Sequence, residues 1–178
     1  WVRLIRKEIQ RVQAGEPGRI WLKLNNFTDL KLIRELYQAS QAGVEVRLIV
    51  RSMFSMVCGL PGTSENIEAV SLVGRYLEHS RLAIFGNGGE PLVYLTSGDW
   101  MARNFDERVE VACPIESPTL RQELVSYFET QWADTANARI WDRELTNRRR
   151  LPPDGVPALD SQRAIRAALL GRIRDLSS

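Results

Sequence analysis

The feature that most constrains the fold is a strand–helix–strand succession near the start of the chain. The segment "IWLKL" (20–24) has the character of a strand, and "VEVRLIV" (44–50) alternates before it turns fully apolar, as a strand entering a buried sheet does. Between them, apolar residues at helical spacing predict an amphipathic helix over 29–42, which Gly43 is placed to end. Because strands joined through a helix usually pair in parallel, this unit predicts an α/β sheet.

The rest of the sequence adds elements of both kinds. A helix is predicted over 2–12, where "AGEPG" (14–18) stops it, and another after Ser117, which is placed to cap it with Pro118 at the first helical position. The segment 52–66 has no clean period and predicts a loop. The remaining predictions are strands around 81–85, at 92–97 and at 108–113, a Pro-rich link at 151–158, and a last helix over 160–176. Together these elements predict a mixed α/β sandwich.

Composition narrows the class of protein. Of 178 residues, 44% are hydrophobic and 26% charged, as in an ordinary globular domain with a core. No run approaches the roughly 18 apolar residues of a membrane span. The two cysteines, Cys58 and Cys113, favour a reducing compartment, and with one histidine they offer no zinc-ligand spacing. Because the sequence opens on Trp1 within a helical pattern, we expect a piece of a longer protein.

Arg51 is the first candidate site residue. It directly follows the strand predicted at 44–50, and ligands of α/β sheets gather at the carboxyl ends of strands. A guanidinium there can hold a phosphate through two parallel hydrogen bonds. The alternative is an ordinary surface arginine that ends a strand.

His79 is the only histidine of the chain and the second candidate. In "EHSR" (78–81), a His-x-Arg pattern at the start of a strand would place His79 and Arg81 on the same face. An imidazole beside a cation, with Glu78 nearby in sequence, suits proton transfer to or from a phosphate oxygen. The alternative is an ordinary surface or core histidine.

The segment "TSGDWMARNFDERVEV" (96–111) supplies further polar groups. Side chains of this kind can orient an imidazole or donate to phosphate, and turn formation or helix capping is the alternative role for each. The candidates are Ser97, Asp99, Asn104 and, within the predicted strand 108–113, Glu110.

The order of these motifs resembles the second half of a phospholipase D-type site, in which two His-x-Lys motifs surround one phosphoryl group. Arg81 stands where that superfamily has lysine. Five blocks, in order, resemble one family more specifically: the C-terminal domain of bacterial polyphosphate kinase. The blocks are "LKLNNFTD" (22–29), "LIVRSMFSMVCGLPG" (48–62), "NIEAVSLVGRYLEHSRLAIFGNGG" (66–89), "VYLTSGDWMARNFDERVEVACPI" (93–115) and "ADTANARIWDRELTNR" (133–148).

The resemblance implies a fold and an activity. The fold would be a phospholipase D-like mixed sheet flanked by helices on both faces, with residues 1–150 as a catalytic half-domain and 151–178 as a link and a helix that packs on the same domain. The activity would be reversible transfer of the terminal phosphoryl group of ATP to inorganic polyphosphate, through a phosphohistidine in a preceding domain and with Mg²⁺ accompanying ATP.

The resemblance also implies roles for individual residues. Arg51 and His79 would contact the ATP phosphates, and His79 would act as acid, base or electrostatic stabiliser, not as the phosphorylated residue. No residue of this chain is predicted to ligate a metal. The supporting candidates are Asn26, Arg81, Ser97, Asp99, Asn104 and Glu110. The basic stretch "RIWDRELTNRRR" (139–150) suits a polyanion path through Arg139, Arg143 and Arg148, or else is a solvated helix end or linker.

The implied partners are ATP or ADP, inorganic polyphosphate and the remaining domains of the same polypeptide, in a homo-oligomer, with no nucleic acid. The implied location is the cytoplasm, with peripheral association at the inner membrane face as in some family members. Because a two-histidine site cannot be completed by one histidine, the isolated chain is expected to fold, to bind ATP or polyphosphate weakly and to lack kinase activity. Two alternatives stay open: a phospholipase D-like phosphodiesterase or nuclease half that acts as a dimer, and a non-catalytic polyanion-binding module.

Overall fold

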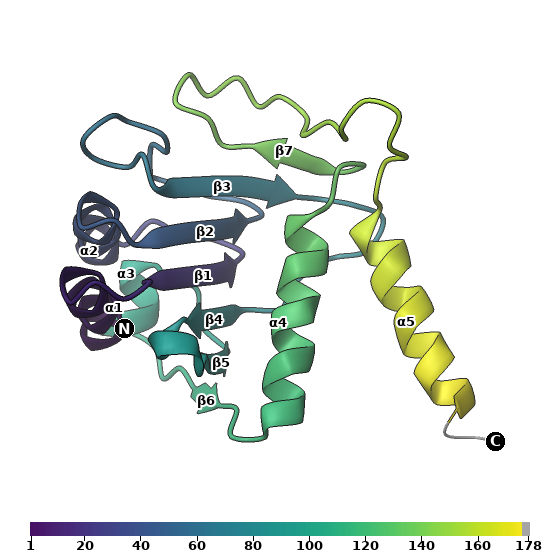
Figure 1. Ribbon diagram of the computed structural model, residues 1–178, viewed down its shortest axis with the longest axis horizontal. Helices are drawn as coiled ribbons and strands as arrows, with labels where there is room; N and C mark the ends of the chain where they lie inside the picture. The colour runs from purple at the N-terminus through teal and green to yellow at the C-terminus, as the bar shows by residue number, and fades with distance from the viewer. Residues whose placement is uncertain (176–178) are drawn as a thin grey trace.

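The structure, a computed structural model, describes residues 1–175 (Figure 1). One mixed sheet of seven strands carries helices on both faces. The elements in chain order are α1 (Val2–Gln13), β1 (Arg19–Leu24), α2 (Leu30–Gln41), β2 (Glu45–Val50), β3 (Ile67–Leu72), β4 (Leu82–Phe85), a 3-10 turn η1 (Asn87–Gly89), β5 (Leu92–Thr96), α3 (Ala102–Asp106), β6 (Ala112–Pro114), α4 (Pro118–Trp132), β7 (Ala138–Ile140) and α5 (Ser161–Asp175).

The sheet is parallel at its centre and antiparallel at its margins. Its strand order is β6-β5-β4-β1-β2-β3-β7. The predicted parallel pair is confirmed, because β1 and β2 run side by side with Leu24 opposite Val50. β3 extends this parallel set, whereas β4 pairs antiparallel with β1 and β7 antiparallel with β3. The carboxyl ends of β1, β2 and β3 therefore meet at one edge of the sheet, toward which their arrowheads point in Figure 1.

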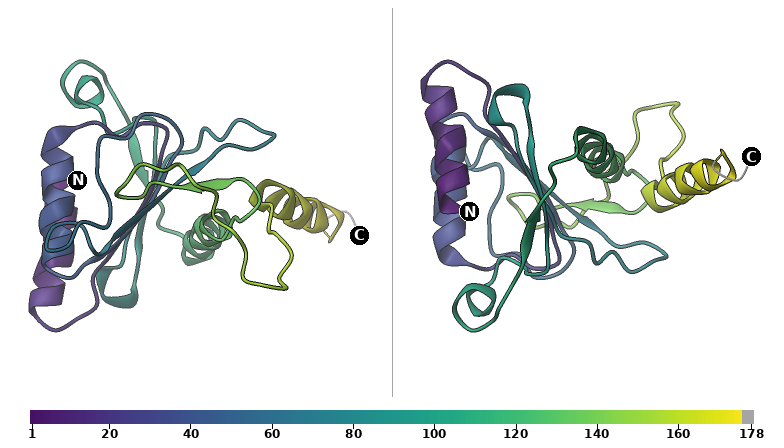
Figure 2. Two further views of the ribbon diagram at one scale, coloured as in Figure 1. Left: turned by 90° about the horizontal axis from the view of Figure 1, so that it is seen from above. Right: turned by 90° about the horizontal axis from the view of Figure 1, so that it is seen from below.

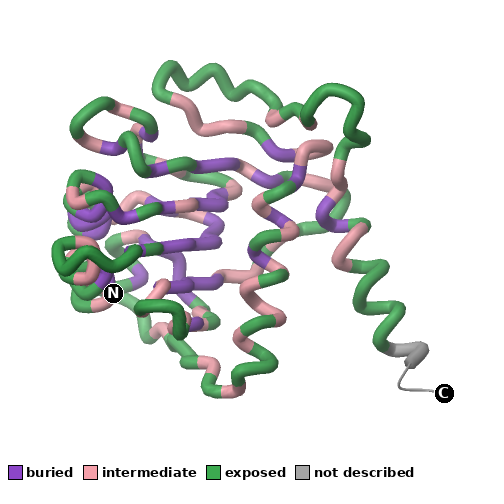
Figure 3. Tube along the Cα trace, viewed as in Figure 1, coloured by how far each residue is buried: buried purple, intermediate pink, exposed green. Residues whose placement is uncertain are grey.

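Both faces of the sheet are covered, which explains why the central strands are apolar almost throughout. α1 and α2 lie on one face, and α4 lies on the other with α5 outside it (Figure 2). Leu22 packs in the core beneath α1 and α2, while its neighbour Trp21 stacks on Phe128 of α4, with ring centroids 5.2 Å apart. Because successive strand residues point to opposite faces, each of the two cores receives alternate residues of β1. The strands are accordingly the most buried part of the trace in Figure 3.

The predicted helix starts are confirmed by their caps. The Asp29 carboxylate accepts the N–H of Leu32 at 2.9 Å, and the Ser117 hydroxyl accepts the N–H of Leu120 at 3.4 Å. The last helix begins at Ser161, and the end predicted for it at position 176 lies outside the described residues. None of the helices formed by residues 1–175 has the length and apolar character needed to cross a bilayer.

Three elements were not predicted, and one predicted strand is shorter than expected. β3, β7 and α3 are additional; β3 buries residues on both faces and therefore shows little alternation. The strand predicted at 108–113 begins only at Ala112, so Glu110 lies before β6 and not within it. The physical reason is exposure: Val109 is 98% exposed and Val111 64%, so the alternating valines reflect no buried face.

Asp134 joins three elements at the carboxyl-terminal end of α4. Its carboxylate is fully buried, and Oδ1 accepts the N–H groups of Asn137 at 2.6 Å and Ala138 at 3.1 Å. Oδ2 accepts the N–H of Ser161 at 2.8 Å and its hydroxyl at 2.7 Å. One side chain therefore fixes the start of β7 and the start of α5 against α4.

Asp134→Ala is expected to lower the free energy of unfolding by about 2–4 kcal/mol, because it leaves several buried hydrogen-bond donors without an acceptor. It should also release α5, so that protease cleaves faster within the exposed link 151–158. Urea denaturation and limited proteolysis measure both effects. Asp154→Ala, an exposed change in that link, is the control; equal behaviour of the two variants would contradict the bracing role of Asp134.

Candidate functional site

Cationic side chains gather at the edge where the parallel strands end. Lys23 lies near the end of β1, Arg51 follows β2, and the segment 73–81, here called the His79 loop, follows β3. The loop projects beyond the ends of the strands, on the side of α5 (Figure 2). The positive charges of Arg51 and Arg81 both act on Lys23. The edge is thus suited to an anionic ligand, at the place where α/β sheets usually bind ligands.

Arg51 presents an unused donor at this edge. Its backbone is held between two strands: its N–H donates to the carbonyl of Leu24 at 3.3 Å, and its own carbonyl accepts the Ser71 hydroxyl at 3.2 Å. The side chain is half-buried, and its Nε is buried with no hydrogen-bond partner in the described part of the chain. A buried guanidinium N–H without a protein acceptor is a candidate donor to an oxyanion.

His79 is exposed on its loop and is not packed in a core. β4 begins at Leu82, so neither His79 nor Arg81 lies in a strand, and the predicted strand placement of the His-x-Arg pattern is wrong in this detail. The Arg81 guanidinium binds within the protein: its Nε donates to Asp99 Oδ1 at 2.9 Å and its Nη1 to the His79 carbonyl at 3.4 Å. Arg81 therefore holds the backbone beneath the imidazole.

Asp99 brings three of the predicted supporting residues together. Its carboxylate accepts the Asn26 side-chain amide at 2.8 Å and the backbone N–H of Asn25 at 2.9 Å, in addition to Arg81. Burial alone would raise the pKa of Asp99, but the hydrogen bonds of Arg81, Asn26 and Asn25 outweigh it and hold that pKa below its usual value. Asn26 also accepts the N–H of Met53 at 3.2 Å, so the cluster ties together the segments after β1, β2 and β5.

Ser97, Asn104 and Glu110 form a separate cluster of predicted residues. The Glu110 carboxylate accepts the Ser97 hydroxyl and, at 2.6 Å, the Asn104 amide. These two hydrogen bonds lower the pKa of Glu110. Gly98 is needed here, because a Cβ would lie 2.9 Å from Glu110 Cγ. The three side chains engage one another, so their arrangement braces the turn after β5 beside the Asp99 cluster.

Sequence reasoning missed a buried ion pair behind the His79 loop. Lys23 is only 2% exposed, and its Nζ lies 3.4 Å from Glu78 Oε2 and 3.3 Å from the Ser80 carbonyl. Glu78 also accepts hydrogen bonds from Gln131 at 2.8 Å, Gln162 at 2.9 Å and the Tyr127 hydroxyl at 3.2 Å. The residues on both sides of His79 are therefore anchored to β1, α4 and α5. The available signal was the lysine inside the otherwise apolar "IWLKL".

The charges of this pair are perturbed in a consistent way. Burial lowers the pKa of Lys23, against the opposing effect of Glu78. Burial would raise the pKa of Glu78, but Lys23 and the amides of Gln131 and Gln162 outweigh it and lower that pKa. The pairing therefore favours the charged form of each group, and the Lys23 ammonium lies against the Glu78 carboxylate beneath the site.

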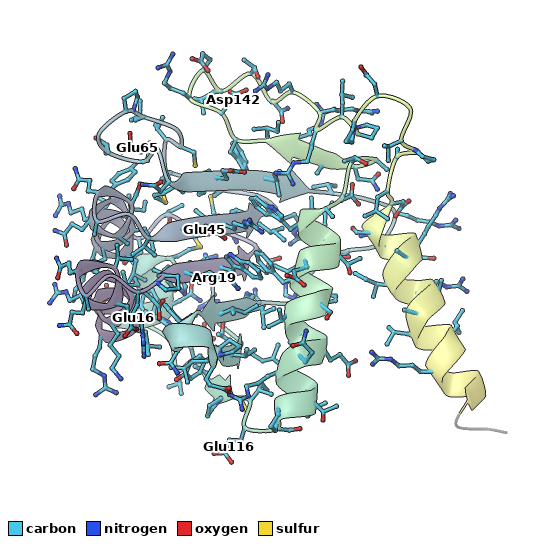
Figure 4. The ribbon with its side chains drawn as sticks, viewed as in Figure 1. Glu16, Arg19, Glu45, Glu65, Glu116 and Asp142 are labelled. Atoms are coloured by element: carbon cyan, nitrogen blue, oxygen red, sulfur yellow. The ribbon has the colours of Figure 1, made fainter. Side chains whose placement is uncertain are left out.

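The basic stretch predicted as a polyanion path lies apart, at β7 and in the loop beyond it, where Figure 4 labels Asp142. The three arginines predicted for this path have local acceptors. Arg139 donates to the Asn147 carbonyl at 2.8 Å, Arg143 pairs with Glu144 and Arg148 lies 3.5 Å from Asp142. These contacts leave the stretch less charge for an external anion than its composition indicates.

The described residues do not fit a metal centre. Among residues 1–175, no group of three or more His, Cys, Asp or Glu side chains is arranged to hold a metal ion. Asp99 and Glu78 are already committed to their own partners. Cys58 is buried, and burial raises the pKa of its thiol to about 12, so the thiolate form is suppressed.

The comparisons with known proteins first define the class. Nuc from Salmonella typhimurium, described as a phospholipase D family member, superimposes with a TM-score of 0.54 at 14% identity, over 77% of this chain and 90% of that one. NucT from Helicobacter pylori gives a TM-score of 0.54 at 14% identity, over 73% and 87%. The chain therefore has a phospholipase D-like fold, as predicted.

The family follows from closer relatives. The family model described as "Polyphosphate kinase C-terminal domain 2" matches residues 1–162. The crystal structure of polyphosphate kinase from Porphyromonas gingivalis superimposes with a TM-score of 0.91 at 42% identity, over 96% of this chain and 26% of that one. Polyphosphate kinase of Escherichia coli (strain K12) is 49% identical over 145 residues, which are 82% of this chain and 21% of that protein. The chain belongs to this polyphosphate kinase C-terminal domain family, and it spans about a fifth of the length of the curated relatives it matches.

Asp99→Asn should lower the free energy of unfolding at neutral pH. Because the folded-state pKa of Asp99 is lowered, the carboxylate contributes stability above its unfolded value of 3.8, and this contribution is lost as pH falls through the lower folded value. Urea denaturation should therefore show a loss of about 2 kcal/mol at pH 7 that shrinks toward pH 3. The exposed change Asp106→Asn is the control, and a gap between Asp99→Asn and the parent that is independent of pH would contradict the assignment.

Lys23→Met should disturb the His79 loop. The change leaves the Glu78 carboxylate without its cation, and we expect the free energy of unfolding to fall by about 1–3 kcal/mol. The double variant Lys23→Met/Glu78→Gln should regain part of this stability, because it also removes the unpaired carboxylate. Since His79 is the only histidine, its imidazole NMR signals identify themselves, and they should move in Lys23→Met. Unchanged signals would show that the pair does not position the loop.

Proposed function

We propose that this chain is the C-terminal catalytic half-domain of a polyphosphate kinase. The reaction is reversible transfer of the terminal phosphoryl group of ATP to inorganic polyphosphate, through a phosphohistidine in another domain of the same polypeptide. The observation that carries the proposal is that one strand edge bears both Arg51, with an unsatisfied buried guanidinium N–H, and the loop that exposes the single histidine of the chain, His79. A chain with one histidine can supply only one half of a two-histidine phosphoryl site.

In this proposal each side chain acts by position and charge. Arg51 holds phosphate oxygens, and His79 faces the transferring group as acid, base or electrostatic stabiliser. Phosphoryl transfer needs mainly alignment and neutralisation of charge on the oxygens, which cations and an imidazole can provide. Lys23 adds positive potential from below, and the Asp99 cluster of Asn26 and Arg81 keeps the loop in place.

We assign the other parts as follows. Residues 1–150 would form the half-domain, and the link from residue 151 onward with helix α5 (Ser161–Asp175) would pack on it, which the Asp134–Ser161 contacts support. Ser97, Asn104 and Glu110 brace the site, and Arg139, Arg143 and Arg148 remain candidates for a polyanion path. Mg²⁺ would arrive with the phosphates of ATP. The partners would be ATP or ADP, polyphosphate and the remaining domains, in a cytoplasmic homo-oligomer that associates with the inner membrane face only peripherally.

In the full-length enzyme, His79→Ala should reduce polyphosphate synthesis by about 100-fold or more, as removal of an acid–base group does. Arg51→Ala should raise the KM for ATP, because it removes a phosphate contact. The measurement is radiolabelled polyphosphate formed from ATP. Arg34→Ala, an exposed change on α2, is the matched control and should keep full activity.

Two outcomes would contradict the proposal. Synthesis by His79→Ala at the parent rate would remove His79 from the reaction, and synthesis by the 178-residue chain alone would show that no second domain is needed. Hydrolysis of a chromogenic phosphodiester by the chain alone would instead favour a phospholipase D-like phosphodiesterase. The ion pair between Arg81 and Asp99 argues against that activity. It occupies the cation of the His-x-cation pattern with a carboxylate of the protein, so this cation is less available to a phosphodiester.

A further inference from the structure

A groove of about 720 Å³ lies between the His79 loop and α5. Its volume falls within the range of about 300–1,000 Å³ that is usual for ligand sites. The loop contributes Arg75 and Tyr76, and α5 contributes Gln162, Arg163 and Arg166. None of these residues belongs to the site described above, except that Gln162 also contacts Glu78.

The groove carries positive charge that the described residues leave largely unpaired. Arg163 has a carboxylate partner, Asp160, at 3.4 Å. Neither Arg75 nor Arg166 forms an ion pair within the described part of the chain, and both side chains are exposed. This distinguishes the groove from the stretch 139–150, where Arg139, Arg143 and Arg148 have acceptors close by.

One wall of the groove is held in place by hydrogen bonds between Gln162 and the His79 loop. Gln162 is only 5% exposed; its amide nitrogen donates to the Tyr76 carbonyl at 2.8 Å and to Glu78 at 2.9 Å, and its amide oxygen accepts the Tyr76 N–H at 2.8 Å. Gly74 allows this contact, because a Cβ there would lie 2.6 Å from the Gln162 oxygen. The loop residue Tyr76 is thereby locked to α5 three positions before His79.

We propose that this groove binds a stretch of inorganic polyphosphate away from the reacting end of the chain, an inference that rests on the proposed function. Closely spaced oxyanions on a flexible polymer match arginine forks set along a groove, because each guanidinium can take two phosphate oxygens. A single-stranded nucleic acid fits less well. Such ligands need open aromatic faces for stacking, and the Tyr76 ring already carries the Arg75 guanidinium 5.8 Å from its centroid.

The consequence for the reaction is specific. Contacts far from the transferring phosphoryl group stabilise ground state and transition state equally, so they lower KM without raising kcat. Only a polyphosphate long enough to extend from His79 into the groove gains from them. ADP and triphosphate do not.

The first test measures binding to the 178-residue chain by titration calorimetry at fixed ionic strength. The double variant Arg75→Gln/Arg166→Gln should bind long-chain polyphosphate about tenfold or more weakly, as loss of two charge-assisted contacts predicts. Arg3→Gln/Arg34→Gln, exposed changes in the α1 and α2 layer, remove the same charge and should have little effect. Thermal unfolding checks that all variants fold.

Equal weakening by both double variants would mean unspecific charge attraction and would overturn the proposal, as would no weakening by either. Oligothymidylate that binds as tightly as polyphosphate, with the same dependence on Arg75 and Arg166, would make the groove a nucleic-acid site instead.

The second test uses the full-length enzyme in the ATP-forming direction. Arg75→Gln/Arg166→Gln should raise the KM for long polyphosphate about tenfold while kcat, the KM for ADP and the rate with triphosphate stay unchanged. If the double variant is active and its KM for long polyphosphate equals that of the parent, the groove does not bind polyphosphate, while the proposed function is unaffected. A parent protein without any turnover would refute the proposed function.

Discussion

The parallel pairing of β1, β2 and β3 is the constraint on which the site depends. Two crossovers return the chain to the same direction, so three strand ends, and the residues that follow them, share one edge. In the register of β1 and β2, Leu24 lies opposite Val50, so that Lys23 comes close to Arg51, which directly follows β2. A slip by one residue would send Lys23 to the other face, because strand side chains alternate. The parallel pairing of the strands therefore determines that Lys23 and Arg51 lie at the same edge of the sheet.

Gathering cations in this way is unfavourable unless each is balanced or reserved for a ligand. Lys23 is balanced by Glu78 and Arg81 by Asp99, and each carboxylate is itself held by further donors. Among the cations that the structure describes at this edge, Arg51 alone keeps an unpaired buried N–H. The same carboxylate, Glu78, ties the His79 loop to α4 and α5 through Gln131 and Gln162, so the C-terminal helix belongs to the architecture of the site.

The parts that follow from local pattern could be predicted, and those that depend on contacts distant in sequence could not. Helix caps and the strand–helix–strand unit are written within a few residues, and Arg51 follows from its place after a strand. β3 was missed because burial on both faces removes alternation, and the Arg81–Asp99 pair was not predicted because the two residues lie 18 positions apart. The Lys23–Glu78 network was missed for the same reason: Lys23 stands out in an apolar strand, but Gln131 and Gln162, which hold its partner Glu78, lie 53 and 84 positions from that glutamate. The Gln162 lock likewise depends on tertiary structure.

The most direct test of the central claim, that His79 and Arg51 together face one phosphate ligand, uses the uniqueness of the histidine. Histidine-selective labelling gives one imidazole to follow by NMR while the chain is titrated with inorganic triphosphate. We predict saturable movement of the His79 signals, with weaker apparent affinity in Arg51→Ala. Triphosphate that binds, by calorimetry, while the His79 signals stay still, or that moves them equally in Arg51→Ala, would contradict that claim.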